Sequence, residues 1–182
     1  MSSALPPRAF IAVAALLVTT PTQAAEPQVL ITANSELHFG TFMVFGSGAR
    51  TVSATGAVSD SNIVALEGRA PAPAYFTISY DRGNENNFVL DIVLDLVISA
   101  PPLVRQGGVE ARLSGYETNL PGALRIDPGR AIRLTMSNCR TRVCTRTFQV
   151  GGRLDVTRQF GGAAVVVPIP VDVTVISAER VR

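Results

Sequence analysis

Apolar residues recur with a period of two along most of this chain, and turn-forming residues interrupt them at short intervals. The clearest run, residues 88–98, has large apolar side chains at every even position, while valine alternates with Asp91 and Asp95 at the odd positions. Successive strand residues point to opposite faces, so this run predicts a strand with one face in a core. The β-branched residues and the flanking asparagine and proline pairs favour a strand over a helix.

The same alternation appears in residues 165–176, where valine and isoleucine occupy the odd positions. Pro168 and Pro170 cannot donate hydrogen bonds to a neighbouring strand, so we expect the first half of this run at a sheet edge. About eight to ten strands joined by turns predict an all-β antiparallel sandwich or barrel. The other expected strands are residues 37–44, 50–58, 63–66, 74–80, 109–116, 131–137 and 147–156, with turns at 46–48 and 151–152 and long loops at 99–108 and 117–129.

The first 24 residues have the charged, apolar and small-residue order of a secretory signal peptide. Their apolar core, residues 9–18, is about half of the ~20 residues that a membrane-spanning helix needs. An uncleaved anchor is the less favoured alternative. We expect cleavage beside Ala24 or Ala25, which leaves residues 25–182 as a single β-sandwich domain in the periplasm, at the cell surface or outside the cell.

Composition excludes several classes of function. The formal net charge of +2 is too balanced to imply a nucleic-acid partner. Every basic side chain is arginine, so Schiff-base chemistry and a P-loop lysine are excluded. Beyond the signal peptide, no stretch is long and apolar enough for a transmembrane helix.

Catalytic and metal-binding residues are also not expected. His38 is the only histidine. Its position between Leu37 and Phe39 predicts that it points away from their face, toward water or the polar side of the sheet, as an ordinary surface histidine. Asp91 and Asp95 would be roughly 13 Å apart on a strand, which exceeds the ~5 to 9.5 Å that glycosidase carboxylates use. We therefore expect no enzymatic activity, no cofactor and no metal site.

Cys139 and Cys144 are predicted to close a small disulfide loop at a hairpin tip, because the chain is expected to be exported. Arginines are dense around this pair. They are expected to be solvated, and the alternative is a patch for an anionic glycan or another anion formed by Arg130, Arg133, Arg140, Arg142 and Arg146.

Several segments, taken in order, resemble the exported bacterial family of domains of unknown function numbered forty-four-oh-two. That family is similar to fimbrial-subunit and spore-coat-U-like proteins, and the resemblance implies an immunoglobulin-like β-sandwich with a structural or adhesive role at the surface. It carries over no functional residues. The cysteine insertion and the long strand at 88–98 depart from the usual members. The segments are residues 37–41 (Leu-His-Phe-Gly-Thr), 50–56, 74–78, 148–156 (with Val-Gly-Gly-Arg-Leu-Asp-Val) and 171–175.

Strand addition is the assembly mode that this reading favours, in which a sheet edge accepts an extended segment from another copy or another surface subunit. Residues 28–32, with Val29, Leu30 and Ile31 at their centre, are short and apolar as a donated segment would be. The same residues also fit as the first strand of their own sandwich, and this is the interpretation that we favour.

The first prediction concerns maturation. Protein recovered from outside the cytoplasm should begin at Ala25 or Glu26, because the apolar core is too short to remain as an anchor. Amino-terminal sequencing or intact mass would measure this. Exported protein that still carries Met1 or Ser2 would contradict it.

Overall fold

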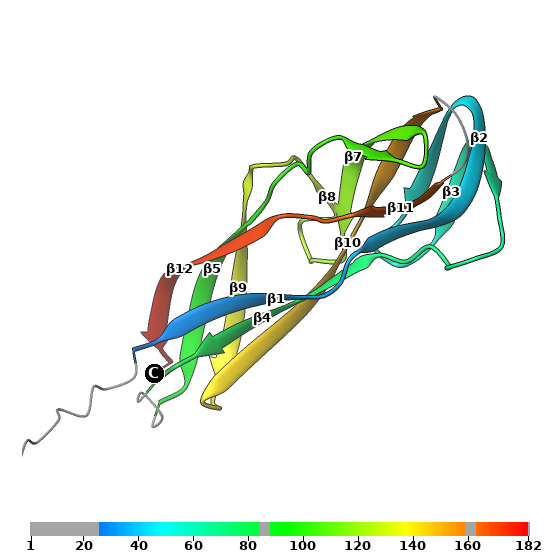
Figure 1. Cartoon of the computed structure of the whole chain (residues 1–182). Helices are drawn as coiled ribbons and strands as arrows, with labels where there is room; N and C mark the ends of the chain where they lie inside the picture. Colours follow the sequence, from blue (N-terminus) through cyan, green and yellow to red (C-terminus); the bar gives the residue numbers. More distant parts are fainter. Residues whose placement is uncertain (1–25, 84–87, 159–162, 182) are drawn as a thin grey trace, which may run out of the picture.

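The computed structural model describes residues 26–83, 88–158 and 163–181, and these form two antiparallel sheets with no helix (Figure 1). The large sheet contains β1 (Gln28–Ser35), β2 (Leu37–Val52), β3 (Val58–Ala65), β4 (Ala74–Asp81), β6 (Val104–Gln106), β7 (Val109–Thr118), β8 (Arg125–Ile126), β10 (Val143–Arg158) and β11 (Ala163–Val167). The small sheet contains β5 (Leu90–Ile98), β9 (Ala131–Cys139) and β12 (Val171–Arg180). No helix in the described ranges is long and apolar enough to cross a membrane.

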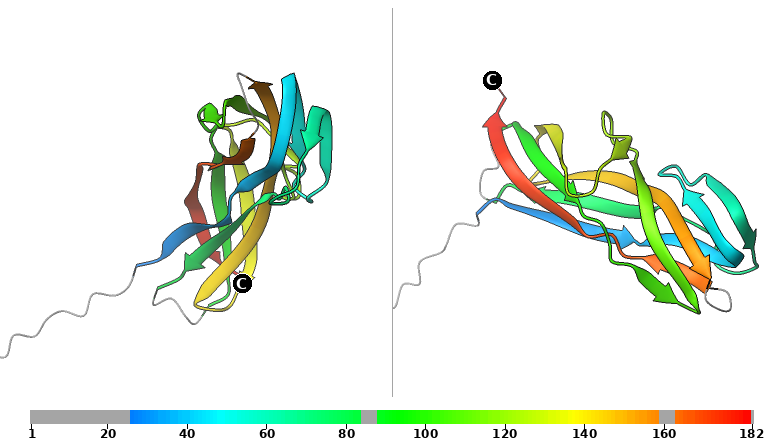
Figure 2. Two further views of the ribbon diagram at one scale, coloured as in Figure 1. Left: turned by 45° about the vertical axis from the view of Figure 1, so that its right-hand side comes forward. Right: turned by 90° about the horizontal axis from the view of Figure 1, so that it is seen from above.

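The main path of the large sheet runs β1-β4-β10-β2-β11, and the small sheet runs β12-β5-β9. Figures 1 and 2 show an elongated molecule in which the small sheet lies beside the β1-β4-β10 half of the large sheet. The buried apolar side chains of both sheets form one core, to which the two aromatic rings of Phe76 and Phe148 contribute a stacked pair at 5.3 Å. This sandwich-like arrangement confirms the predicted all-β antiparallel fold, with twelve strands in place of about eight to ten.

β5 confirms the strand predicted at residues 88–98. Its even-numbered residues are buried and its odd-numbered residues are half-buried. Asp95 accepts two hydrogen bonds from Arg133 of β9, whereas Asp91 accepts one from the backbone N–H of Asn138. The two aspartates therefore have separate structural partners on the outer side of the small sheet.

The first half of the run at residues 165–176 lies at a sheet edge, as expected, but the expectation of one continuous strand was wrong. The run divides into β11, which pairs with β2 in the large sheet, and β12, which pairs with β5 in the small sheet. Pro168 and Pro170 lie in the segment between them, where the chain crosses from one sheet to the other. Because neither proline has an N–H to donate, both suit a segment without a strand ladder.

The two predicted glycine turns also lie inside strands. β2 continues through Gly46 and Gly48 by a bulge, and the turn to β3 falls at residues 53–57, where the Ser53 N–H donates to the Ala57 carbonyl. β10 continues through Gly151 and Gly152, where its register with β7 shifts by a bulge. A Cβ at Gly151 would collide with the backbone at the end of β2, so glycine permits the close approach of these two strands.

Both predicted long loops contain short strands. β6 pairs with β7 through a turn at Gly107 and Gly108, whose φ angles of 59° and 77° favour glycine. β8 pairs with the end of β7. A Gly-Gly pair between two apolar runs is a hairpin signal, but Gly107 and Gly108 were expected to belong to a long loop.

Arg50 of β2 is one of the largest buried side chains, with an exposed fraction of 1%. Its guanidinium donates to both carboxylate oxygens of Asp60 on β3, at 2.6 and 2.7 Å, and to the Phe39 carbonyl at 2.8 Å. It also lies 5.2 Å from the centroid of the Phe42 ring. This ion pair between a buried guanidinium and a partly exposed carboxylate fixes β3 against the long strand β2.

Replacement of Asp60 by asparagine should lower the free energy of unfolding by about 3 kcal/mol, because the Arg50 charge would stay buried without its counterion. Urea denaturation would measure the loss. The matched control is Asp95→Asn, which breaks an ion pair with the exposed Arg133 and should change stability far less. Equal losses in the two variants would contradict the role assigned to Arg50.

Candidate functional site

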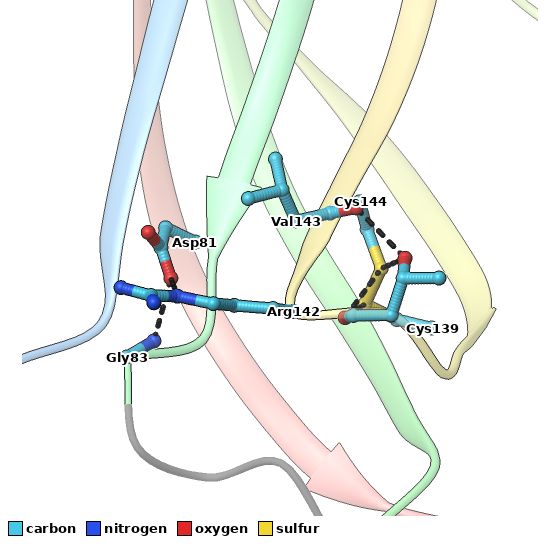
Figure 3. A network of polar contacts seen from close by, with 7 residues as sticks. Asp81, Gly83, Cys139, Arg142, Val143 and Cys144 are labelled. Carbon is cyan, nitrogen blue, oxygen red and sulfur yellow. Dashed lines mark hydrogen bonds and ion pairs between the residues drawn. A yellow bond between two sulfur atoms is a disulfide. The ribbon is translucent and has the colours of Figure 1, made fainter.

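A disulfide joins Cys139 at the end of β9 to Cys144 near the start of β10, with 5.9 Å between the two Cα atoms (Figure 3). This confirms the predicted bond. β9 belongs to the small sheet and β10 to the large sheet, so the bond ties the two sheets together at this end of the molecule. The Thr141 hydroxyl donates to the Val143 carbonyl and orders the turn between the cysteines.

The disulfide turn is also attached to the end of β4. The Arg142 side chain donates to the Asp81 carboxylate at 3.3 Å, and the Gly83 N–H donates to the same oxygen at 2.8 Å (Figure 3). The Gly83 hydrogen bond, with a smaller contribution from Arg142, holds the pKa of Asp81 below its ordinary value. The fully buried guanidinium of Arg82 donates to the carbonyls of Cys139 and Phe88.

The five arginines considered as an anion-binding patch do not gather at one place. Arg130 precedes β9, whose nine residues separate it from Cys139 by roughly 30 Å. Arg133 pairs with Asp95, and Arg142 pairs with Asp81. Arg146 donates to the Thr135 carbonyl of β9 at 2.7 Å. Of the five, Arg140 and Arg142 alone share the disulfide turn.

His38 was expected to be an ordinary surface histidine, and that expectation was wrong. Its exposed fraction is 6%, because the segment at Pro71 and Ala72 covers this part of β2. Burial, together with the charge of Arg69, lowers the pKa of the imidazole and outweighs the opposite effect of Glu36. In the described ranges, the imidazole has no hydrogen bond to a nucleophile or a carboxylate, and no three potential ligands are grouped to hold a metal.

Two strand edges lie open beside one another. β1 ends the path of the large sheet and pairs with β4, while β12 ends the path of the small sheet and pairs with β5. β1 and β12 run side by side where the edges of the two sheets meet (Figures 1 and 2). They form no ladder with each other in the described residues, so each strand has one unpaired backbone edge.

Apolar residues along these edges are incompletely covered. Val165, Val167 and Ile169, which precede β12, are all buried with exposed fractions of at most 9%. The alternation continues into β12, but the inward side chains there are only half-buried, and so are the inward side chains of β1. We call these two edges and their half-buried residues the open seam: Val29, Ile31, Val171, Val173 and Val175.

The structure also places the amino-terminal segment. Val29 and Ile31 pair with Tyr80 and Ile78 of β4 in the chain's own sheet, in agreement with the favoured interpretation. The predicted signal peptide and its expected cleavage residues Ala24 and Ala25 lie outside the described residues.

Sequence reasoning missed the open seam, and it also missed Arg50 and Arg82. The odd-even alternation around Arg50 could have placed it on the inward face with Val52, but an arginine there is normally read as a break in the core pattern. The open seam has no sequence signal of its own, because valines that are half-buried and valines that are fully buried show the same alternation with polar residues.

Comparison with known proteins gives one match. The model of a family described as "Domain of unknown function (DUF4402)" matches residues 29–175, nearly the whole described chain. No curated protein matches the chain, and no solved structure does.

The disulfide generates a stability prediction. In a Cys139→Ser/Cys144→Ser double variant, the free energy of unfolding should be about 2 kcal/mol lower than in the parent. The loss is modest because so short a loop restricts few unfolded conformations. Chemical denaturation of the two proteins would measure this. Alkylation of the denatured, unreduced parent should label neither cysteine, and labelling of both would contradict the bond.

Proposed function

We propose that this chain, which belongs to the DUF4402 family of domains of unknown function, is an exported, non-enzymatic structural or adhesive subunit of the bacterial surface. It assembles by strand addition at the open seam. The observation that carries the proposal is the pair of adjacent unpaired edges, β1 and β12, with half-covered apolar side chains along both.

An open strand edge with apolar side chains favours association. Unpaired N–H and C=O groups form a template for another strand, and natural monomers usually protect such edges with charge, proline or a covering segment. On β12 the prolines precede the strand, and the half-buried residues between Val171 and Val175 are valines. The charged Asp172 is exposed on the opposite face, so neither a proline nor an inward-pointing charge protects this part of the edge. An added strand would satisfy the backbone groups and bury the valines together.

The chemistry of the open seam specifies the incoming segment. It must be extended, so that its backbone can pair with β1 or β12, and it must carry an apolar side chain at every second position to cover the valines. β1 is engaged with β4 and is a poor donor from the folded state. The incoming segment therefore comes from a part of another copy other than β1, or from another surface subunit, which gives a fimbria-like or coat-like assembly.

Export has two supports. Residues 1–24 have the order of a secretory signal, and disulfides such as Cys139–Cys144 form and persist in oxidising compartments. The separate positions and existing partners of the arginines favour the structural role over the anion-binding alternative.

Replacement of Val173 by asparagine should prevent assembly, because it places an unpaired amide in the apolar part of the open seam. The monomer should lose only about 1 kcal/mol, since Val173 is already half-exposed. The matched control is Thr174→Asn, the same new side chain on the exposed face of the same strand, which should assemble like the parent.

Cell fractionation followed by native sizing measures the outcome, and circular dichroism confirms that each variant is folded. Surface polymers of the parent and of Thr174→Asn, with monomeric Val173→Asn, support strand addition. A parent that stays monomeric, or a Val173→Asn protein that assembles as the parent does, contradicts it.

A further inference from the structure

The outer face of the large sheet divides into a charged half and an uncharged half. Where β10 lies between β2 and β7, the outward side chains include ion-pairing groups, with Arg153 and Asp155 at 2.9 Å and Ser114 donating to Asp155 at 2.5 Å. Where β4 lies between β1 and β10, the outward side chains are hydroxyls, amides, one leucine and one tyrosine. We call this second half the uncharged face: Leu30, Thr32, Asn34, Tyr75, Thr77, Ser79, Thr145, Thr147 and Gln149.

The alternation of β4 fixes which side chains belong to the uncharged face. Ala74, Phe76, Ile78 and Tyr80 point into the core, so the intervening residues point outward. The register places Thr32, Thr77 and Thr147 in one row across three strands, and Leu30, Ser79 and Thr145 in the next. Along β4 itself, charge begins at the disulfide end, where Asp81 is paired with Arg142.

Tyr75 is the aromatic residue of the uncharged face. It lies on the central strand directly opposite Gln149 of β10, and its exposed fraction is 37%. Tyr80 and Tyr116, the other two tyrosines, are buried at 3% and 4%. A half-exposed ring on the face of a sheet offers an apolar surface to a ligand with little loss of side-chain freedom on binding.

Amide and hydroxyl groups on both sides of Tyr75 are held in place by hydrogen bonds. On the β1 side, the Thr77 hydroxyl donates to the Asn34 side-chain carbonyl at 2.8 Å. On the β10 side, the Asn119 side chain accepts from the Gln149 N–H at 2.8 Å and donates to the Gln149 side-chain carbonyl at 3.2 Å. Each group keeps further hydrogen-bonding capacity for a ligand. Because these side chains are already held in place, they lose little conformational entropy on binding.

We propose that the uncharged face binds a neutral oligosaccharide, with Tyr75 contacting a sugar ring and the flanking amides and hydroxyls bonding its hydroxyl groups. A sugar presents apolar C–H faces and many neutral donors and acceptors, which match a tyrosine surrounded by Asn34, Thr77 and Gln149. Charge complementarity supports a neutral ligand, because a phosphate or a uronate would find no cation on this face.

The proposed site is separate from the open seam. It uses outward side chains of β1, β4 and β10, whereas strand addition uses backbone edges and inward side chains. Saccharide binding is therefore expected in folded monomer as well as in any assembly. It supplies the adhesive part of the proposed function, and it can fail while assembly succeeds.

Tyrosine fluorescence gives a direct test, because the chain contains no tryptophan and Tyr75 is the exposed one of three tyrosines. The mature protein is titrated with cellotetraose, chitotetraose and maltotetraose, and with tetragalacturonate as the anionic comparison. At least one neutral probe should protect the fluorescence from quenching by acrylamide. Its affinity, measured by calorimetry, should fall by at least about tenfold in Tyr75→Ala.

The matched control is Arg112→Ala on β7, in the charged half of the same sheet, which should bind like the parent. Circular dichroism must show both variants folded. The proposal is overturned if none of the three neutral probes binds, if Tyr75→Ala binds as tightly as the parent, or if tetragalacturonate alone binds.

Discussion

The antiparallel ladder of β10 holds the molecule together. Its first half pairs with β4, and its second half lies between β2 and β7, so the backbone groups of one sixteen-residue strand are shared among three partners. Gly151 lets β10 pass from β4 to β2 without a collision. Near the start of β10, the disulfide of Cys144 ties the strand to the small sheet. Loss of this ladder would separate the β1-β4 part from the β2-β3 part.

The same ladder explains why the seam stays open. β10 positions β4, and β4 positions β1, so the edge of the large sheet ends at β1. The small sheet is held at its opposite side by β9 and the disulfide, and it ends at β12. The two edges meet without pairing, which leaves valine side chains half-covered and backbone groups free. Burying them together is the physical gain available to an added strand.

Sequence reasoning succeeded where one local signal decides the structure. The alternation of residues 88–98 predicted β5, and the close cysteine pair predicted the disulfide. It failed where the structure depends on a distant partner. Gly151-Gly152 reads as a turn until β2 is known to lie against it, and His38 reads as exposed until Pro71 covers the strand. The uncharged face needs the register of β1, β4 and β10, which are far apart in sequence.

Amide hydrogen exchange tests the central claim that the seam accepts a strand. It is measured on protein recovered from the cell surface in its native form, and on folded monomer released from it. If the seam accepts a strand, the backbone N–H groups on the unpaired edges of β1 and β12 should exchange quickly in the monomer and slowly in the native form. The N–H groups of β5 should be protected in both. Slow exchange of both edges in the monomer, or fast exchange in the native form, would contradict it.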